Sequence, residues 1–292
     1  MIKTGQIAIL ITCYNKEKYI GDCIRSALLN GSPVIVVDDC STDTSWDIIR
    51  NFKGIRRHRA EQNGGASSAT LIALEIAQRE GFQWAALLDG DDVIAPDATS
   101  YFGKVLSDTD AQAIYSRPDR SYNEDRRLAV APVDDATYRI VHDPLKQWLQ
   151  KPRASTALCA KISIIKEDLD ACARIQDHQI AFSIHRNSKT VVYSDARTHF
   201  YSVAKPGENL VLDSKEGGRS AVVAYNLHWE KVKSHPIGYK YQKRAFSALT
   251  KLRKNSVFGL GFTSFLFVIT PFKSAVPSLI RHQLLTYALK FM

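Results

Sequence analysis

The sequence predicts an α/β protein whose central sheet is mostly parallel and is covered by helices on both faces. Apolar runs of strand length alternate with helical patterns through the first 115 residues, which is typical of such sheets. A polar cluster follows each of the first four predicted strands. Because ligands bind beyond the carboxyl ends of the strands in this fold class, the four clusters predict one site along a single sheet edge.

Four segments are expected to form the first strands: residues 6–15 (QIAILITCYN), 32–39 (SPVIVVDD), 55–60 (IRRHRA) and 84–89 (WAALLD). The segments after them have helical periodicity: residues 16–29, 41–52, 69–81 and 95–106. Ser41 and Thr42 are candidate caps of the second helix. Residues 111–117 predict a fifth strand.

The pattern is less regular in the second half of the chain. Residues 117–130 are expected to form a polar hairpin. Two helical patterns follow, over 155–175 and from residue 176 onward, and "TVVYSD" then predicts a strand. Beyond these, 203–218 resembles a loop and 219–254 a long helical stretch.

The positive charge is concentrated at the carboxyl end. The chain has 292 residues and a net charge of +9, and residues 230–292 alone carry eleven basic residues and one acidic residue. Such asymmetry indicates a polyanionic partner, a membrane surface or a nucleic acid. No nucleic-acid motif supports the second, so we expect no nucleic-acid binding.

The carboxyl-terminal segment favours an anionic membrane surface. Residues 255–272 are uncharged, but two glycines, several hydroxyls and Pro271 make a membrane-spanning helix unfavourable. Phenylalanines beside lysines suit insertion at an interface. The alternative is that this segment packs on its own domain or on another subunit. Five cysteines without paired or metal-type spacing, and an amino-terminal apolar run too short for a signal peptide, favour a cytoplasmic protein.

Three carboxylates crowd into one short stretch. Asp89, Asp91 and Asp92 lie within four residues, directly after an apolar run. Their mutual repulsion is offset if a divalent cation such as Mg²⁺ or Mn²⁺ binds between them, with substrate phosphates completing the coordination. The alternative is an acid-rich helix start, in which Asp92 or Asp97 caps the following helix.

Four motifs in fixed order carry a resemblance to a known family. "AILITCYNKEKYIGDCIRSAL", "VIVVDDCSTDTS", "NGGASSA" and "LLDGDDVIAPD" resemble the inverting glycosyltransferases of family 2, which have the GT-A fold. The resemblance covers residues 6–107 and, more weakly, 155–202. It implies a GT-A domain over residues 1–215, with a nucleotide-binding half (1–115) and an acceptor-side half (116–215). Residues 216–292 would form the helical basic extension.

The resemblance also implies roles for individual residues. Those expected to bind the nucleotide are Thr12, Tyr14, Asn15, Asp39, Gly65 and Asp89, with Asp39 accepting a hydrogen bond from the base. Asp91 is expected to bind the metal, with Asp89, Asp92 and His199 as further candidate ligands. For Asp38 and Asp43 we favour loop capping.

The general base is expected in the second half of the chain. The family has an acidic pair at the start of a helix before a strand, and Gln176 and Asp177 stand at the matching place. We therefore expect Asp177 to be the base, with an N-cap as its alternative role. His178, His199 and Asp195 are rival candidates.

The resemblance implies metal-dependent transfer of a sugar from a nucleotide-sugar, expected to be a UDP-sugar, to a membrane-linked glycan such as a lipopolysaccharide or capsule intermediate. The protein would then lie at the inner face of the cytoplasmic membrane. Three positions depart from the family: Thr70 and Leu71 replace an Arg-Asn pair, and Gln176 replaces an acid. No "QxxRW" motif follows, so one sugar is expected per encounter. The alternatives are a sugar-nucleotide pyrophosphorylase and a degenerate glycosyltransferase that acts as a membrane scaffold.

Overall fold

A computed structural model describes residues 4–119, 131–133, 136–150, 157–169, 176–202 and 231. The chain divides into two compact units, Met1–Lys205 and Pro206–Met292, and the description below concerns the first. The loop, the long helix and the apolar segment expected after residue 202 lie outside the described residues, so those expectations stay predictions. So does the domain boundary at residues 215 and 216. Within the described ranges, no helix is long and apolar enough to cross a membrane.

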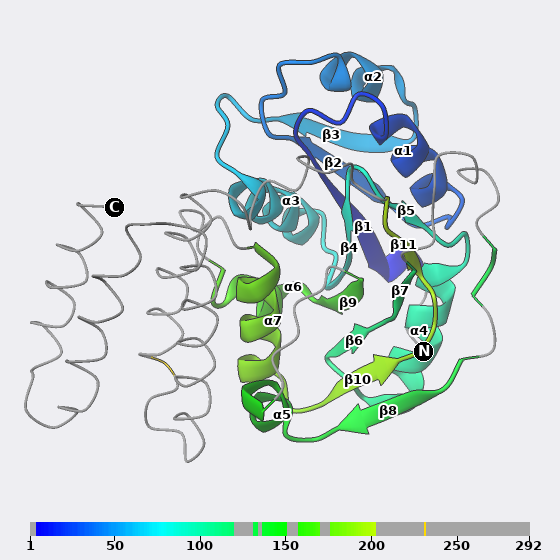
Figure 1. Cartoon of the computed structure of the whole chain (residues 1–292), viewed down its shortest axis with the longest axis vertical. Coiled ribbons are helices and arrows are strands. Elements are labelled where there is room, and N and C mark those ends of the chain that lie inside the picture. Colours follow the sequence, from blue (N-terminus) through cyan, green and yellow to red (C-terminus); the bar gives the residue numbers. More distant parts are fainter. Residues whose placement is uncertain are drawn as a thin grey trace, which may run out of the picture. The chain divides into compact units, whose positions relative to one another are not determined.

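An eight-stranded sheet forms the centre of the first unit, with the strand order β3-β2-β1-β4-β9-β6-β10-β8 (Figure 1). The strands are β1 (Ile7–Cys13), β2 (Val34–Asp38), β3 (Ile55–Arg59), β4 (Trp84–Asp89), β6 (Ala113–Tyr115), β8 (Tyr138–Val141), β9 (Leu158–Lys161) and β10 (Val191–Ser194). The first four are parallel to one another, and β9 is antiparallel to both of its neighbours. The predicted mostly parallel α/β sheet is therefore confirmed.

Alternation along β1 explains why both faces of the sheet are covered. Ile7, Ile9 and Ile11 belong to one buried cluster, and Ala8 and Leu10 belong to the other. The first cluster contains residues of α1 (Ile20–Leu28), α2 (Ser45–Asn51) and α4 (Ala98–Thr109). The second contains residues of α3 (Ala66–Arg79), α6 (Ile162–Lys166) and α7 (Gln176–Asn187). A strand whose two sets of side chains are both apolar requires helices on both sides.

A small second sheet supports the loop after β4. It consists of β5 (Val93–Ile94), β11 (His199–Phe200) and β7 (Pro118–Asp119), in that order. The helix α5 (Pro144–Gln150) and the short 3₁₀ helix η1 (Thr4–Gln6) complete the described elements. Since β11 pairs with β5, a segment near residue 200 holds the chain directly after the acidic stretch.

Three expectations from the sequence were wrong in detail. Residues 158–161 form strand β9 rather than part of a helix, because they pair with β4 and β6 on either side. Helix α3 begins at Ala66, three residues before its expected start, directly after Gly65 in a positive-φ conformation (φ 83°). The N-cap position of α2 is Thr44, not Ser41 or Thr42, whose hydroxyls contact Asn15 instead.

Candidate active site

The carboxylate of Asp39, which follows β2, binds the Gly-rich turn after β3. Its two oxygens accept hydrogen bonds from the backbone amides of Gly64 (2.9 Å) and Gly65 (2.7 Å). A Cβ atom at position 64 would lie 2.6 Å from the Ser68 hydroxyl and 2.7 Å from the Ser68 Cβ, so packing against Ser68 requires glycine there. Burial raises the pKa of Asp39, and the two amides oppose that rise. Each carboxylate oxygen keeps a lone pair for one further donor.

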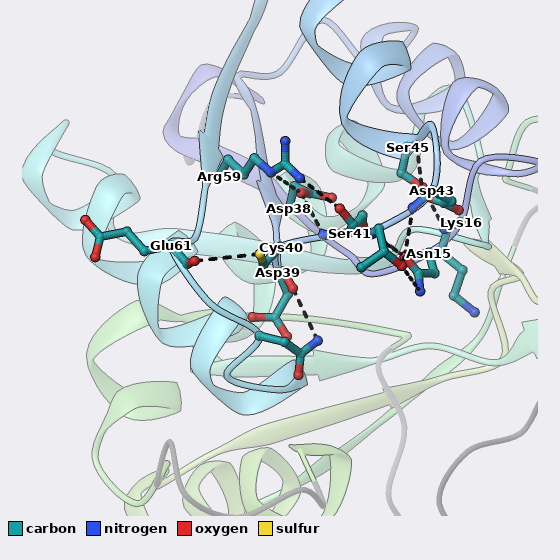
Figure 2. Close-up of polar contacts among 12 residues, drawn as sticks. Asn15, Lys16, Asp38, Asp39, Cys40, Ser41, Asp43, Ser45, Arg59 and Glu61 are labelled. Carbon is teal, nitrogen blue, oxygen red and sulfur yellow. Dashed lines mark hydrogen bonds and ion pairs between the residues drawn. The ribbon is translucent and has the colours of Figure 1, made fainter.

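The loop after β1 is tied to the loop after β2 (Figure 2). Asn15 has a positive φ of 52°, and its amide donates to the Ser41 hydroxyl at 2.9 Å. Its side-chain oxygen accepts from the Thr42 amide at 2.8 Å. The next amide, of Lys16, donates to the Ser45 hydroxyl at 2.8 Å. Asn15 therefore fixes the shape of the edge, while the neighbouring Tyr14 is 36% exposed.

Two aspartates of the second loop have the capping role that we favoured for them. Asp38 is fully buried and accepts from the Ser41 amide at 3.0 Å. Asp43 accepts from the amides of Glu17 (3.1 Å) and Ser45 (2.9 Å). These bonds lower the pKa of Asp43, although its partial burial acts in the opposite direction. The loop-capping interpretation of both residues is confirmed.

The loop after β4 turns sharply across the end of β1. The amide of Gly90 donates to the carbonyl of Thr12 at 2.9 Å, and a Cβ atom at position 90 would lie 2.9 Å from that carbonyl. A glycine is therefore needed between the acidic residues of "DGDD". The half-buried Asp89 thus lies at the end of the strand next to Thr12, with which it pairs in register.

Asp91 faces a lysine from the neighbouring loop. The ammonium nitrogen of Lys16 lies 2.5 Å from Oδ2 of Asp91, and about a quarter of each side chain is accessible (26% and 24%). Partial burial disfavours the charged lysine, but attraction by Asp91 and then by Asp89 outweighs it and raises the Lys16 pKa. The crowded carboxylates therefore already have a cation of this chain beside them.

Asp92 differs from its neighbour Asp91. It is 7% exposed, and its Oδ1 accepts from the Ser202 amide at 2.9 Å. Burial, followed by repulsion from Asp89 and Asp91, raises its pKa to about 9. A neutral carboxyl that accepts a hydrogen bond from the Ser202 amide favours a structural role for Asp92 in holding the β4 loop. The role of Asp92 as a metal ligand stays a prediction.

His199 is buried and both of its ring nitrogens have partners. Nε2 lies 2.8 Å from the carbonyl of Leu87 in β4, and Nδ1 lies 2.8 Å from the hydroxyl of Thr198. Burial lowers the pKa of His199 to about 4, so the ring is neutral. This geometry connects β11 to the strand that ends in Asp89. The role of His199 as a metal ligand stays a prediction, and these contacts count against it.

Helix α7 starts against the first turns of α3. The buried side chain of Gln176 donates to the Thr70 hydroxyl at 2.7 Å, and the Ser67 hydroxyl donates to Gln179 at 3.4 Å. Two positions that depart from the family pattern, Thr70 and Gln176, thus contact each other. Through α3 and Gly65, this contact connects the start of α7 with the turn that Asp39 binds.

Asp177 lies in the first turn of α7, next to Gln176. Its side chain is exposed, yet the protein atoms packed around it raise its pKa by desolvation. The neighbouring His178 has its pKa lowered for the same reason. A carboxylate with a raised pKa accepts a proton at a pH closer to neutrality than an ordinary aspartate does. Asp195 instead binds the amide and hydroxyl of Thr137.

The chemistry of the β4 loop fits a hard divalent cation. Asp89 and Asp91 supply carboxylate oxygens from one strand end, and Mg²⁺ or Mn²⁺ is commonly held by one or two carboxylates plus substrate phosphates. Within the described part of the chain, no three His, Cys, Asp or Glu side chains are grouped to hold a metal ion. Water or substrate oxygens would supply the remaining ligands of such an ion.

Several contacts that shape this site were not predicted from the sequence. Lys16 had no predicted role, because nothing in "YNKEKYI" distinguishes Lys16 from Lys18. Thr70 and Gln176 were expected to be separate departures from the family rather than a pair. Only Gly90 had a local signal, since a glycine inside an acidic cluster at a strand end indicates a tight turn.

Comparison with known proteins identifies relatives of this arrangement. The Glycosyl transferase family 2 model matches residues 8–168, more than half of the chain. TuaG of Bacillus subtilis (strain 168), named as a teichuronic acid biosynthesis glycosyltransferase, is 39% identical over 93 residues, which are 30% of this chain and 36% of TuaG. TarS of Staphylococcus aureus (strain Mu50), a poly(ribitol-phosphate) beta-N-acetylglucosaminyltransferase, is 31% identical over 116 residues, which are 35% of this chain and 20% of TarS. The chain thus matches about a third of TuaG and a fifth of TarS.

Solved structures share the fold. The crystal structure of residues 1–349 of S. aureus TarS in complex with UDP-GlcNAc superposes with a TM-score of 0.61 and 17% identity, over 82% of this chain and 72% of that one. The mannosyltransferase PcManGT from Pyrobaculum calidifontis, in complex with GDP-Man and Mn²⁺, superposes with a TM-score of 0.53 and 15% identity, over 92% and 81% of the two chains. At these identities the likeness establishes a GT-A-like fold. With the family match over residues 8–168, the chain belongs to glycosyl transferase family 2.

Proposed function

We propose that the protein is an inverting, metal-dependent glycosyltransferase that moves a sugar from a UDP-sugar to a glycan acceptor. The observation that carries this proposal is the linked set of carboxylates at one sheet edge. Asp39 follows β2, Asp89 is the last residue of β4, and Asp91 lies in the loop after it. The contact of Gln176 with Thr70 connects the start of α7, through α3, with the turn that Asp39 binds.

The donor nucleotide would bind where the first three loops meet. Asp39 would accept a hydrogen bond from the base, since each of its oxygens keeps one lone pair. The exposed Tyr14 ring and the Thr12 position would line the same pocket, and Asn15 would hold its shape through its contacts with the second loop. The TarS structure with UDP-GlcNAc has a similar fold, which supports a UDP-sugar as the donor.

The β4 loop would receive the diphosphate of the donor. Asp91, with Asp89 beside it, would hold Mn²⁺ or Mg²⁺ together with phosphate oxygens. A divalent ion there stabilises the negative charge that builds on the diphosphate as the glycosidic bond breaks. Asp92 and His199 would brace the loop through Ser202 and Leu87.

Asp177 would act as the general base. The acceptor hydroxyl attacks the anomeric carbon on the face opposite the diphosphate, and its proton passes to the Asp177 carboxylate. The new carbon–oxygen bond forms as the bond to the phosphate oxygen breaks, so one displacement inverts the anomeric centre. The raised pKa of Asp177 suits this role, and activity should fall on acidification, because the protonated carboxyl cannot accept the proton.

The acceptor is proposed to be a cell-surface glycan carried on a membrane lipid. TuaG is named for teichuronic acid biosynthesis, and TarS is named for a poly(ribitol-phosphate) acceptor. Both names support a cell-surface polymer as the acceptor. The net charge of +10 after residue 229 supports attachment to the inner face of the cytoplasmic membrane.

The Asp177→Asn variant tests this function. We expect donor affinity to stay near wild type and transfer to fall by at least about 10²-fold, the usual scale for a lost general base. Transfer is followed as UDP release from a panel of UDP-sugars with acceptor glycans and Mn²⁺, and isothermal calorimetry with UDP and Mn²⁺ reports donor affinity. The matched control is Asp108→Asn, which removes the same charge from an exposed position on α4. Equal transfer by the Asp177 variant and wild type would contradict the assignment.

A further inference from the structure

The ion pair between Lys16 and Asp91 carries an inference about how the proposed metal and donor bind. The lysine amide is anchored to Ser45 at 2.8 Å, and the preceding Asn15 is anchored to Ser41 and Thr42. The ammonium group is therefore presented to the acidic loop from a fixed backbone. Figure 2 shows the Lys16 side chain pointing away from the loop that contains Ser41 and Ser45.

The ammonium and a divalent cation compete for the same oxygen. The Lys16 nitrogen lies 2.5 Å from Oδ2 of Asp91, and Mg²⁺ would need an oxygen at about 2.0–2.1 Å. A divalent ion on Asp91 would lie close to the Lys16 ammonium, and two positive centres so close repel strongly in a partly buried site. Binding of a divalent ion to Asp91 is therefore favoured when Lys16 moves away.

A displaced Lys16 needs another anion. The Lys16 side chain is only 26% accessible, and its backbone amide is held by Ser45. Both features restrict movement of the ammonium group into bulk water. A diphosphate that binds beside Asp89 and Asp91 would bring oxygens within reach of the same ammonium group. Those oxygens would also complete the coordination that two carboxylates leave open.

We propose that Lys16 is the counter-cation of Asp91 in the absence of substrate and transfers to the donor diphosphate when the metal binds. Lys16 thereby couples the two binding events: the divalent ion binds weakly alone and tightly with the nucleoside diphosphate. Because coupling is reciprocal, the metal raises nucleotide affinity by the same factor. The inference rests on the proposed metal-dependent function.

Electron paramagnetic resonance of free Mn²⁺ tests the coupling without measuring activity. The full chain is titrated with Mn²⁺ in the absence and in the presence of UDP, for wild type, Lys16→Met, Lys16→Gln and Lys18→Met. The Lys18 variant removes the same charge two residues away and serves as the control. In the absence of UDP, both Lys16 variants should bind Mn²⁺ at least about 10-fold more tightly than wild type, within the usual range of coupling between sites. The increase in Mn²⁺ affinity caused by UDP should shrink accordingly.

The outcomes separate this inference from the proposed function. If wild type binds Mn²⁺ with UDP but both Lys16 variants bind it without UDP as weakly as Lys18→Met does, Lys16 forms only an ordinary ion pair and the inference fails alone. If wild type binds no Mn²⁺ even with UDP, the metal-dependent function fails and the inference fails with it. Lys16→Arg, which keeps the charge, should behave like wild type and guards against misfolding of the neutral variants.

Discussion

Two strand ends of the same sheet carry adjacent aspartates and use them in opposite ways. After β2, Asp38 and Asp39 are buried, and their oxygens accept backbone amides of Ser41, Gly64 and Gly65. After β4, Asp91 is partly accessible and pairs with a lysine side chain. The β2 end binds its carboxylates mainly through backbone amides, with the Arg59 guanidinium 3.4 Å from Asp38, whereas Asp91 at the β4 end pairs with the flexible side chain of Lys16.

The difference between the two strand ends follows from the groups that contact their carboxylates. Backbone amides cannot move away without moving the chain, so their hydrogen bonds to Asp38 and Asp39 stabilise the shape of the β2 loop. A lysine ammonium on a flexible stem can be exchanged for another cation. Under the proposed function, the exchangeable partner of Asp91 suits metal binding, and Asp39 suits recognition of a neutral base.

The largest effect expected from breaking this contrast is at Asp91. Asp91→Ala should lower Mn²⁺-dependent UDP affinity by about 10²-fold, the upper range of coupling between two ligands. Its UDP affinity without metal should not fall, because Lys16 is then free to meet the diphosphate. Calorimetry with UDP, with and without Mn²⁺, measures both values. Asp108→Ala is the matched control. If Asp91→Ala binds UDP in the presence of Mn²⁺ as tightly as this control does, Asp91 does not bind the metal, and the inferred difference between the two strand ends is wrong.

A smaller effect of the opposite kind is expected at Asp38. Asp38→Ala removes a fully buried acceptor of the Ser41 amide and the partner of Arg59, 3.4 Å away. The unfolding free energy should fall by about 2 kcal/mol, the usual cost of a buried group left without its hydrogen bond. Urea unfolding measures this loss. Mn²⁺-dependent UDP affinity should stay at the wild-type value, and a loss of affinity in a folded variant would contradict a purely structural role.

The sequence was sufficient to predict most of the fold over residues 1–115. Three of the first four strands are apolar runs of five to seven residues, and polar residues mark where each of these runs ends. Loop capping by Asp38 and Asp43 was also predictable, because short acidic side chains beside a helix start bind backbone amides. Strand β9 was not predictable, because "LCAK" becomes a strand only through pairing with β4 and β6.

The charge states of Asp91 and Asp92 could not be predicted from the sequence, for a different reason. The spacing of Asp91 and Asp92 shows two equivalent carboxylates, but one meets Lys16 and the other meets the amide of Ser202. These partners lie 75 and 110 residues away in the chain. Only the fold determines which of the two carboxylates is buried, and burial decides which of them carries a charge.

Asp92 gives the most specific prediction. Its folded-state pKa of about 9 lies far above the ordinary aspartate value of 3.8, so the folded carboxyl keeps a proton over a pH range in which the unfolded chain has released it. Stability should therefore fall as the pH rises between these values, by at most about 1.4 kcal/mol per pH unit. Asp92→Asn keeps an oxygen for the Ser202 amide and removes the ionisation. Without metal, its melting temperature should exceed that of wild type by more at pH 8.5 than at pH 5.5, whereas Asp108→Asn, on an exposed helix face, should show no such trend. If Asp92→Asn and wild type lose stability in parallel from pH 5.5 to 8.5, Asp92 is ionised in the folded protein, and the β4 loop then holds three charges rather than two.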